Sequence, residues 1–425
     1  MCRHAGACPT GLLLGIVLRS ALTGLVIDAI LRLVPLPPGT WAVGRVLVDR
    51  PGIWNLAMVL SNEQEQKLTR LCRRLVDQSA ARVIVPAQQP ESGFWFGGGN
   101  MITGGDGALY VVGRYRNRGD SRLGTGAGER GLELAIFRSG DQGATFEKVA
   151  SWTKADLNVG DTTVVSIEGS ALLKSHRGVE LFVSTEKDGV GYPAGFEDFL
   201  KEGTGVWSID VLQADAVEGL KAAKVTPVYA CSDPAWLHIK DPFVYVDHAD
   251  TDYLLFCSHP FCWTSSNTGY LTRLPGESDF SGAVLDFFPR GVTWDVAMTR
   301  GTAVVDVPQV GAFSGQQVSL MFYDGGECVR NLEEHSAAVK RPRGYSCEEL
   351  GGAAYFVDGH LAQTQRLSKY APLFVSPTGT GCSRYVDVLK TPERWYVTWQ
   401  QSQVDLSQPL VMNVVEVSEI EELLS

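Results

Sequence analysis

Apolar and polar positions alternate in short runs from about residue 92 to the end of the chain. Runs rich in valine, isoleucine, phenylalanine and tyrosine are separated by turns that contain glycine, aspartate, asparagine and proline. This pattern is typical of β-strands joined by tight turns. One helix is predicted before this region, over residues 63–80, with Ser61 as its N-cap.

Five segments of the β-rich region repeat one layout, in which a polar residue is followed by a first strand and an aromatic-rich second strand. The first strands are predicted at residues 97–102, 166–173, 239–246, 298–305 and 382–389. The second strands are predicted at residues 109–116, 179–187, 252–260, 317–326 and 394–402. Third strands are predicted at residues 132–139, 205–212, 268–274, 353–357 and 410–417. Each interval has room for one four-stranded antiparallel sheet.

Five such sheets arranged radially form an all-β fold, a five-bladed β-propeller, whose first strands line a central channel. The polar residues that mark the repeats are Asn100, Glu168, Asp241, Arg300 and Arg384. In a propeller they are expected to converge at one end of the channel. The alternatives are a large β-sandwich or two β-domains. We predict a propeller over residues 86–420 and an N-terminal extension with helical character over residues 1–85.

Charge separates this extension from the rest of the chain. Residues 1–85 hold 10 Lys+Arg and 5 Asp+Glu, a net of +5, whereas the remainder holds 27 and 43, a net of −16. An acidic body argues against nucleic acid or an anionic membrane as the main partner. The extension is interpreted as a presequence, an anchor or a leader with no role in the fold.

The apolar segment at residues 11–36 is interrupted by Arg19, Asp28 and Arg32. A stable membrane-spanning helix is therefore not predicted. No small-x-small cleavage site ends the segment, so a cytoplasmic or organellar location is favoured over secretion. The nine cysteines include no Cys-x-x-Cys pair, which suggests neither a disulfide framework nor a zinc site. No cofactor is predicted, although one cation in the central channel remains an option.

Residues 139–146, with the sequence SGDQGATF, resemble the Asp box of sialidases and other propellers. The motif predicts a β-turn in which Asp141 accepts hydrogen bonds from main-chain amides and Gly143 takes a positive φ. This role is structural, so Asp141 is not counted among the catalytic candidates.

The sequence IKDPFVYVD at residues 239–247, together with the five repeats, resembles the five-bladed propeller glycosidases of the arabinanase, invertase and levansucrase group, and is family 43-like. The resemblance implies a carbohydrate substrate and catalytic carboxylates at the starts of inner strands. In that group the first blade generally supplies an acidic residue, where this chain has Asn100. Pro242 cannot donate to a sheet ladder, so it is predicted to open its strand, with Asp241 at the strand entrance.

Glycoside cleavage needs two carboxyl groups in different environments. Glu168 is predicted as the general acid, and Asp241 as the base or the carboxylate that tunes it. The structural alternatives are a strand-start cap for Asp241 and an ion pair with an arginine for Glu168. Asp295 is the preferred third carboxylate. The other candidates for that role are Asp120, Glu129, Glu186 and Asp324.

Three arginines, Arg114, Arg300 and Arg384, lie in or next to inner-strand positions, and Tyr385 follows the last of them. Guanidinium groups bind carboxylates through paired hydrogen bonds, so an anionic sugar is one option. The alternative is that these arginines hold the site together by ion pairs. The other residues predicted to bind substrate are Asn100, Lys240, His259 and Trp263.

The function predicted from the sequence is that of an exo-acting glycoside hydrolase that removes a terminal sugar in the channel funnel. One alternative is a sialidase-like hydrolase of an acidic sugar that uses the arginine cluster. A second alternative is a non-catalytic carbohydrate-binding propeller.

Overall fold

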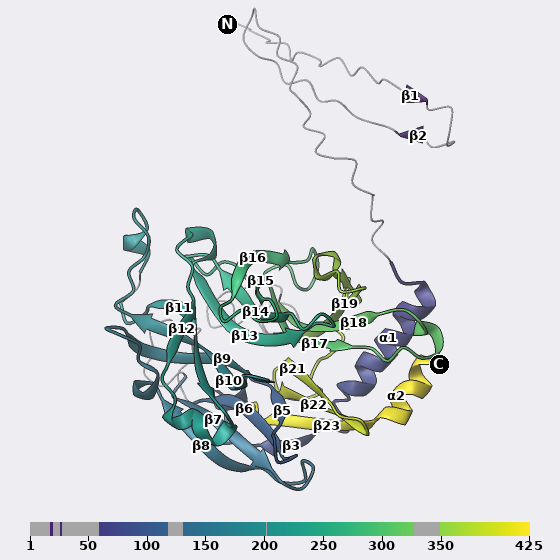
Figure 1. Ribbon diagram of the computed structural model, residues 1–425, viewed down its shortest axis with the longest axis horizontal. Coiled ribbons are helices and arrows are strands. Elements are labelled where there is room, and N and C mark those ends of the chain that lie inside the picture. Colours follow the sequence, from purple (N-terminus) through teal and green to yellow (C-terminus); the bar gives the residue numbers. More distant parts are fainter. Residues whose placement is uncertain (1–17, 20–25, 28–58, 118–130, 201, 327–348) are drawn as a thin grey trace, which may run out of the picture. The chain divides into compact units, whose positions relative to one another are not determined.

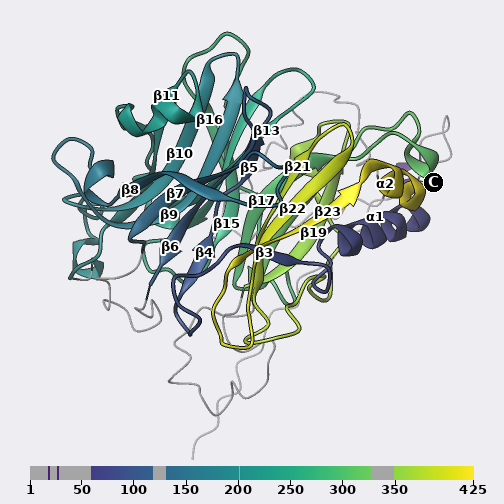
Figure 2. The same ribbon diagram turned by 90° about the horizontal axis from the view of Figure 1, so that it is seen from below.

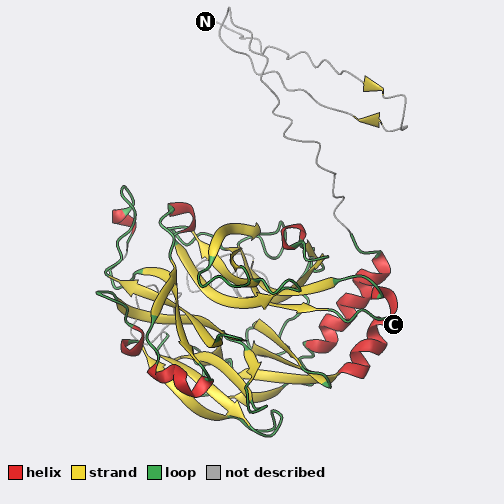
Figure 3. Ribbon diagram, viewed as in Figure 1, coloured by secondary structure: helices red, strands yellow, loops and turns green. Residues whose placement is uncertain are grey.

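The structure, a computed structural model, describes residues 18–19, 26–27, 59–117, 131–200, 202–326 and 349–425. The candidates Asp120 and Glu129 lie outside the described residues. The chain divides into two compact units, Met1–Leu56 and Ala57–Ser425. Strands β1 (Leu18–Arg19) and β2 (Val26–Ile27) pair antiparallel in the first unit. The second unit contains the described helices and every other described strand (Figure 3).

The second unit consists of five blades of antiparallel strands. Blade one contains β4 (Trp95–Gly97), β5 (Met101–Thr103), β6 (Leu109–Arg116), β7 (Glu133–Ser139) and β8 (Glu147–Thr153). Blade two contains β9 (Thr163–Ser175), β10 (Gly178–Asp188), β11 (Val206–Ala214) and β12 (Thr226–Tyr229). Blade three contains β13 (His238–Val246), β14 (Asp252–His259), β15 (Asn267–Arg273) and β16 (Ser281–Phe288).

The last two blades are joined through a single parallel pair, Leu350 with Ser383. Blade four contains β17 (Met298–Asp306), β18 (Val318–Gly326), β19 (Leu350–Val357) and β20 (Gln365–Arg366). Blade five contains β21 (Ser383–Lys390), β22 (Arg394–Gln401), β23 (Leu410–Glu416) and β3 (Arg82–Val85). The innermost strands β5, β9, β13, β17 and β21 contact one another in turn around a common centre (Figure 1). The chain is therefore an all-β, five-bladed propeller, as predicted.

The strand that closes the ring comes from the N-terminal side of the propeller. Strand β3 pairs with β23 and so completes blade five. Helix α1 (Asn62–Leu75) lies beside helix α2 (Val417–Leu424) at the edge of this blade (Figure 2). Ser61 caps α1, as predicted, through a reciprocal capping box with Gln64. Residues 62–85, which were assigned to the extension, thus belong to the propeller unit, and α1 ends before residue 80.

Each inner strand is interrupted at a similar level. In β9 the register shifts between Ile167 and Ser170. In β13, β17 and β21 it shifts between Lys240 and Phe243, Gly301 and Ala303, and Arg384 and Asp387. In blade one the interruption is the gap between β4 and β5, which both pair with β6. Bulges of this kind re-aim side chains, and they are frequent beside active sites. The five repeats therefore each turn a residue toward the channel.

The register corrects two expectations from the sequence. Pro242 lies inside β13, in the bulge after Lys240, and does not open the strand. A proline is tolerated there because a bulged residue need not donate to the ladder. The bulges also place Tyr385 at the position of Asp241, whereas Arg384 corresponds to Lys240. The marker of the fifth repeat is thus shifted by one residue.

Polar side chains tie each inner strand to the next blade by accepting a main-chain N–H. The five pairs, each with the acceptor side chain first and the donor amide second, are Asn100 with Leu172 (2.7 Å), Asp241 with Gly169 (2.9 Å), Thr268 with Gly301 (2.9 Å), Asp324 with Tyr385 (3.1 Å) and Asp387 with Met101 (2.8 Å). Three of the donors, Gly169, Gly301 and Tyr385, lie at the register shifts, so these bonds give partners to amides where the ladders are irregular. They hold the residues at the channel mouth in fixed positions.

The turn after β7 has the hydrogen bonds predicted for residues 139–146. Asp141 Oδ1 accepts from the main-chain N–H of Thr145 at 2.9 Å, and Ser139 Oγ accepts from that of Gly143 at 2.8 Å. Gly143 has a φ of 86°, which favours glycine. The turn lies between β7 and β8, where Asp141 serves the local fold.

Candidate active site

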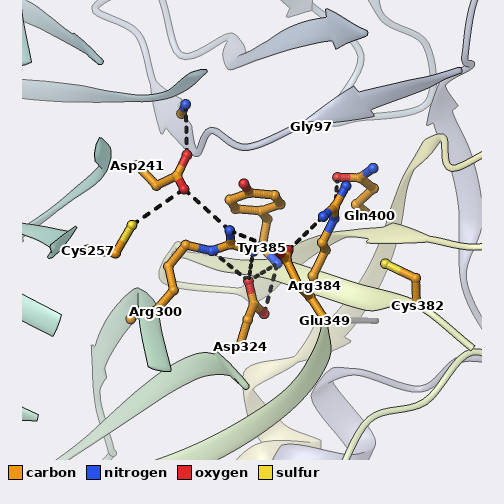
Figure 4. Close-up of polar contacts among 12 residues, drawn as sticks. Gly97, Asp241, Cys257, Arg300, Asp324, Glu349, Cys382, Arg384, Tyr385 and Gln400 are labelled. Atoms are coloured by element: carbon orange, nitrogen blue, oxygen red, sulfur yellow. Dashed lines mark hydrogen bonds and ion pairs between the residues drawn. The ribbon is translucent and has the colours of Figure 1, made fainter. Parts of the chain in front are cut away.

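The cluster at the channel mouth is made of charged and aromatic side chains from all five blades. Its members are Arg114, Glu168, Lys240, Asp241, Arg300, Asp324, Glu349, Arg384 and Tyr385. Six of the residues predicted for the site therefore meet there with Glu168. Figure 4 shows the part of the cluster around Tyr385.

Arg114 lies between the two carboxylates predicted to be catalytic. Its Nη2 atom donates a hydrogen bond to Glu168 and lies 3.9 Å from Asp241 Oδ1. The same nitrogen donates to the hydroxyl of Tyr385 at 3.2 Å. A Cβ atom at Gly98 would lie 1.8 Å from Nη1 of Arg114, so only glycine leaves room for the guanidinium.

Asp241 is buried and surrounded by cations. Its Oδ2 atom lies 3.3 Å from Arg300 Nη1 and 3.7 Å from Lys240 Nζ. Its Oδ1 atom accepts the amide of Gly169, and the thiol of Cys257 lies 3.6 Å from Oδ2. This arrangement suits a carboxylate that stays ionised and positions its neighbours.

A second group of ion pairs lies next to Tyr385 (Figure 4). Arg300 pairs with Asp324 at 2.7 Å and also with Glu349. Arg384 donates to the same Glu349 carboxylate at 2.6 Å. The guanidinium of Arg300 stacks on the Tyr385 ring, with its carbon 3.9 Å from the ring centroid.

Three residues at the mouth have left-handed backbone conformations, which residues other than glycine rarely adopt. The φ angles are 53° for Asp241, 54° for Tyr385 and 55° for Trp263. Such conformations cost about 1–3 kcal/mol each, and they cluster at functional sites. For Asp241 and Tyr385 the bulges impose the conformation, which turns both side chains to the channel.

The pKa values of the carboxyl groups diverge because the cations are unevenly distributed. Burial would raise the pKa of Glu168, but Arg114 and Lys240 hold it below its usual range. Burial would also raise the pKa of Asp241, but Lys240 and Arg300 outweigh it and hold this pKa well below its usual range. For Asp324 burial prevails and raises the pKa to about 6. Burial also raises the pKa of Tyr385 to about 12.

Aromatic side chains adjoin Lys240 on one side of the cluster. Its ammonium lies 5.6 Å from the ring centroid of Trp207 and 5.4 Å from that of Trp263. The ring of His259 lies 4.7 Å from that of Trp263, and its Nε2 atom lies 3.5 Å from Cys257 Sγ. The predicted His259 and Trp263 are thus joined to the site through Lys240 and Cys257.

Three predicted candidates have other partners. Asn100 uses both ends of its amide on the main chain of Leu172, at 2.7 and 2.9 Å, so it links two blades. Asp295 is fully buried and pairs with Arg366 at 2.7 Å and Tyr323 at 3.2 Å. Its contacts place it in a buried ion pair within blade four. Glu186 accepts the amide of Gly205.

Glu349 was missed by the sequence analysis. It lies just before β19, outside the first strands on which the repeat was based. Its one local signal is its place before a glycine-rich apolar strand, and that signal does not indicate a partner. Asp324 lies near the end of β18 and was among the candidates.

The channel beside the cluster is narrow. A cavity of about 20 Å³ is lined by glycines of blades one, two and four, by Phe243 and by Tyr385. This volume holds roughly one water molecule, so a sugar would have to bind at the mouth. Within the described residues, no group of three or more histidine, cysteine or acidic side chains is placed to hold a metal ion. No helix in the described part of the chain is long and apolar enough to cross a membrane.

Comparisons with solved structures find chains of similar fold. A structure described as a glycoside hydrolase shares 11% sequence identity, with a TM-score of 0.53, over 84% of this chain and 96% of the other. A GH43_1 enzyme from Xanthomonas citri in complex with xylotriose shares 12% identity, with a TM-score of 0.47, over 84% and 93%. An endo-arabinase from Bacteroides thetaiotaomicron shares 12% identity, with a TM-score of 0.46, over 79% and 97%. At 11% identity, the first similarity establishes a shared fold.

No protein-family model matches the chain, and no curated protein matches its sequence. The chemistry of the site therefore has to be argued from its own residues. Two carboxylates and a tyrosine meet around Arg114. Two further arginines, Arg300 and Arg384, lie next to them. Such a set can stabilise or attack an electron-poor carbon and can bind an anionic group.

Proposed function

We propose that this propeller is a glycoside hydrolase that acts on a terminal sugar at the channel mouth. The observation that carries the proposal is the meeting of Glu168 and Asp241, from adjacent blades, at a single nitrogen of Arg114. The side chain of Glu168 is 14% exposed and that of Asp241 is 3% exposed. Glu168 is therefore the carboxylate that a sugar can reach, and Asp241 acts as the tuning carboxylate.

The pKa of Glu168 bears on its role. A general acid needs a raised pKa, whereas the pKa of Glu168 is lowered. With Arg114 in place, Glu168 suits the attacking or water-activating role. Because burial alone would raise this pKa, a ligand anion that draws Arg114 away would turn Glu168 into the proton donor predicted from the sequence.

An acidic sugar is supported by the arginines around Tyr385, as in the sialidase-like alternative. Two observations speak against true sialidase chemistry. The propeller has five blades, and sialidases have six. The hydroxyl of Tyr385 accepts from Arg114, and the pKa of Tyr385 is raised to about 12, so this tyrosine is not prepared as a nucleophile.

A non-catalytic carbohydrate-binding propeller is the second candidate. The link that Asn100 makes to Leu172 favours it, because this residue stands where the resembling glycosidases have an acidic group. Binding would then use the same mouth, with no bond cleaved. The two candidates share a ligand class and differ in turnover.

Turnover of a panel of 4-nitrophenyl glycosides, neutral and acidic, tests the proposal. We expect Glu168→Gln to lower kcat by about 10²–10⁴-fold, and Asp241→Asn to lower it as well. Glu133→Gln, in an ion pair on the surface of blade one, is the matched control and should leave kcat unchanged. Unchanged turnover by Glu168→Gln would refute the assignment. Binding of sugars without any turnover by the native protein would support the binding propeller instead.

A further inference from the structure

Arg300 and Arg384 hold one carboxylate between them, that of Glu349. Arg384 Nη1 donates to Glu349 Oε2 at 2.6 Å, and Arg300 donates to both oxygens of the same group. Figure 4 shows the two guanidinium groups converging on this carboxylate from opposite sides. Two guanidinium groups on one carboxylate form a strong, directional anion site.

The two arginines differ in what else they hold. Arg300 is 2% exposed and keeps a second carboxylate, Asp324, at 2.7 Å. Arg384 is 15% exposed, and among the described residues Glu349 is its only carboxylate partner. Its other hydrogen bonds go to the amide oxygens of Gln400 and Gln408, at 3.2 and 3.3 Å. Arg384 is thus the cation of this site that can exchange its anion.

Glu349 can leave the site without a change in the sheet. Its main chain is fixed, because its carbonyl accepts the amide of Ser383 at 3.3 Å and the next residue, Leu350, pairs with Ser383 in register. Its side chain is 18% exposed. A rotation about side-chain bonds therefore suffices to bring the carboxylate into solvent.

We propose that Glu349 occupies the subsite for the carboxylate of an acidic sugar, and that the ligand binds by taking its place. The inference rests on the proposed function and names the substrate class as carboxylated sugars, such as uronic acids. Exchange of one carboxylate for another keeps Arg384 paired with an anion, and Arg300 retains Asp324 throughout. Tyr385 links this subsite to Glu168: its ring stacks on Arg300, and its hydroxyl accepts from Arg114, which also donates to Glu168.

Calorimetric binding of matched sugars tests the exchange. The probes are glucuronate with glucose, and galacturonate with galactose. Glu349→Gln removes the competing charge and should bind at least one of the acids roughly tenfold tighter, while the neutral sugars change little. Arg384→Lys loses the planar fork and should weaken acid binding roughly tenfold. Arg394→Lys, which replaces an arginine ion-paired with Glu416 on the same blade, is the matched control.

The outcomes separate this inference from the proposed function. Acid binding that Glu349→Gln leaves unchanged or weakens, in a variant with native Tm, overturns the exchange. So does equal binding of acids and their neutral partners by the native protein. If glycosides are hydrolysed through Glu168 but Arg384→Lys alters no acid preference, only the subsite is wrong. If acids bind through Arg384 and no glycoside is cleaved, the subsite stands and the hydrolase proposal fails.

Discussion

The Oδ1 atom of Asp241 accepts a hydrogen bond from the main-chain amide of Gly169, 2.9 Å away in the neighbouring blade. The next polar link at this junction is Ser184, whose hydroxyl accepts from the amide of Asp241 and donates to the carbonyl of Gly169, each at 3.0 Å. The inner strands of two blades are thereby held together at the residue that tunes the site.

Replacement of Gly169 by alanine should damage the site. An added Cβ would lie 2.6 Å from Asp241 Oδ1 and 2.7 Å from its Cα, so Asp241 would have to move. We expect a loss of stability of about 1–3 kcal/mol and a larger loss of sugar turnover or binding. Gly105→Ala, where an added Cβ meets nothing within 4 Å, is the control. Native-like activity and Tm in Gly169→Ala would show that the junction is not rigid.

Replacement of Arg114 by glutamine should move the pH dependence of turnover. Burial raises the pKa of Glu168 and Arg114 lowers it, so removing the cation leaves burial dominant and the pKa rises. The limb of the kcat/KM profile that reports Glu168 should shift to higher pH. Arg138→Gln, in an exposed pair with Asp106, should leave the profile in place. A profile unmoved in Arg114→Gln would mean that Glu168 does not titrate in catalysis.

Asp387 should make the propeller less stable as the pH rises. Burial raises the pKa of its folded carboxyl to about 7, from an ordinary value of 3.8. The unfolded chain therefore releases this proton first, so the stabilising contribution is complete below pH 3.8 and is lost as the pH rises through 7. The loss amounts to at most about 4 kcal/mol.

Asp387→Asn keeps an acceptor for the amide of Met101 and cannot ionise. We therefore expect it to be more stable than the native protein at pH 8, with a smaller or no gain at pH 4. Urea unfolding at the two pH values measures this difference. Equal gains at both values would exclude titration of Asp387 as the cause.

The buried ion pairs between blades two and three should be needed for stability. Arg273 donates to both oxygens of Glu180, at 2.7 and 2.6 Å, and to Asp252 at 3.0 Å, with all three groups nearly buried. Arg273→Met leaves the buried carboxylate of Glu180 without its cation and leaves Asp252 with the more distant Arg177, 3.5 Å away. It should therefore cost about 3–5 kcal/mol in the free energy of unfolding. Lys148→Met, which breaks the exposed pair with Glu133, should cost less than about 1 kcal/mol. Similar costs for the two would contradict the structural role of Arg273.

The sequence by itself determined the blades, because strand formation depends on local alternation and on nearby turn residues. Second strands such as β6 and β22 lie within one or two residues of their predicted positions. The motif around Asp241 identified one residue of the site for the same local reason. Ser61 was also recognised as a cap, since its partner Gln64 is three residues away.

Only the tertiary structure decided what lies next to what. Strand β3 closes blade five although more than 300 residues separate it from β23, a pairing that no local pattern encodes. The bulges set which residue of each repeat faces the channel. Because of them, Tyr385 and not Arg384 is the residue of blade five that is equivalent to Asp241. Glu349 belongs to the site because it forms an ion pair with Arg384, whereas Asp295 forms one with Arg366. Charges find partners through space, so their roles depend on neighbours that the order of residues does not reveal.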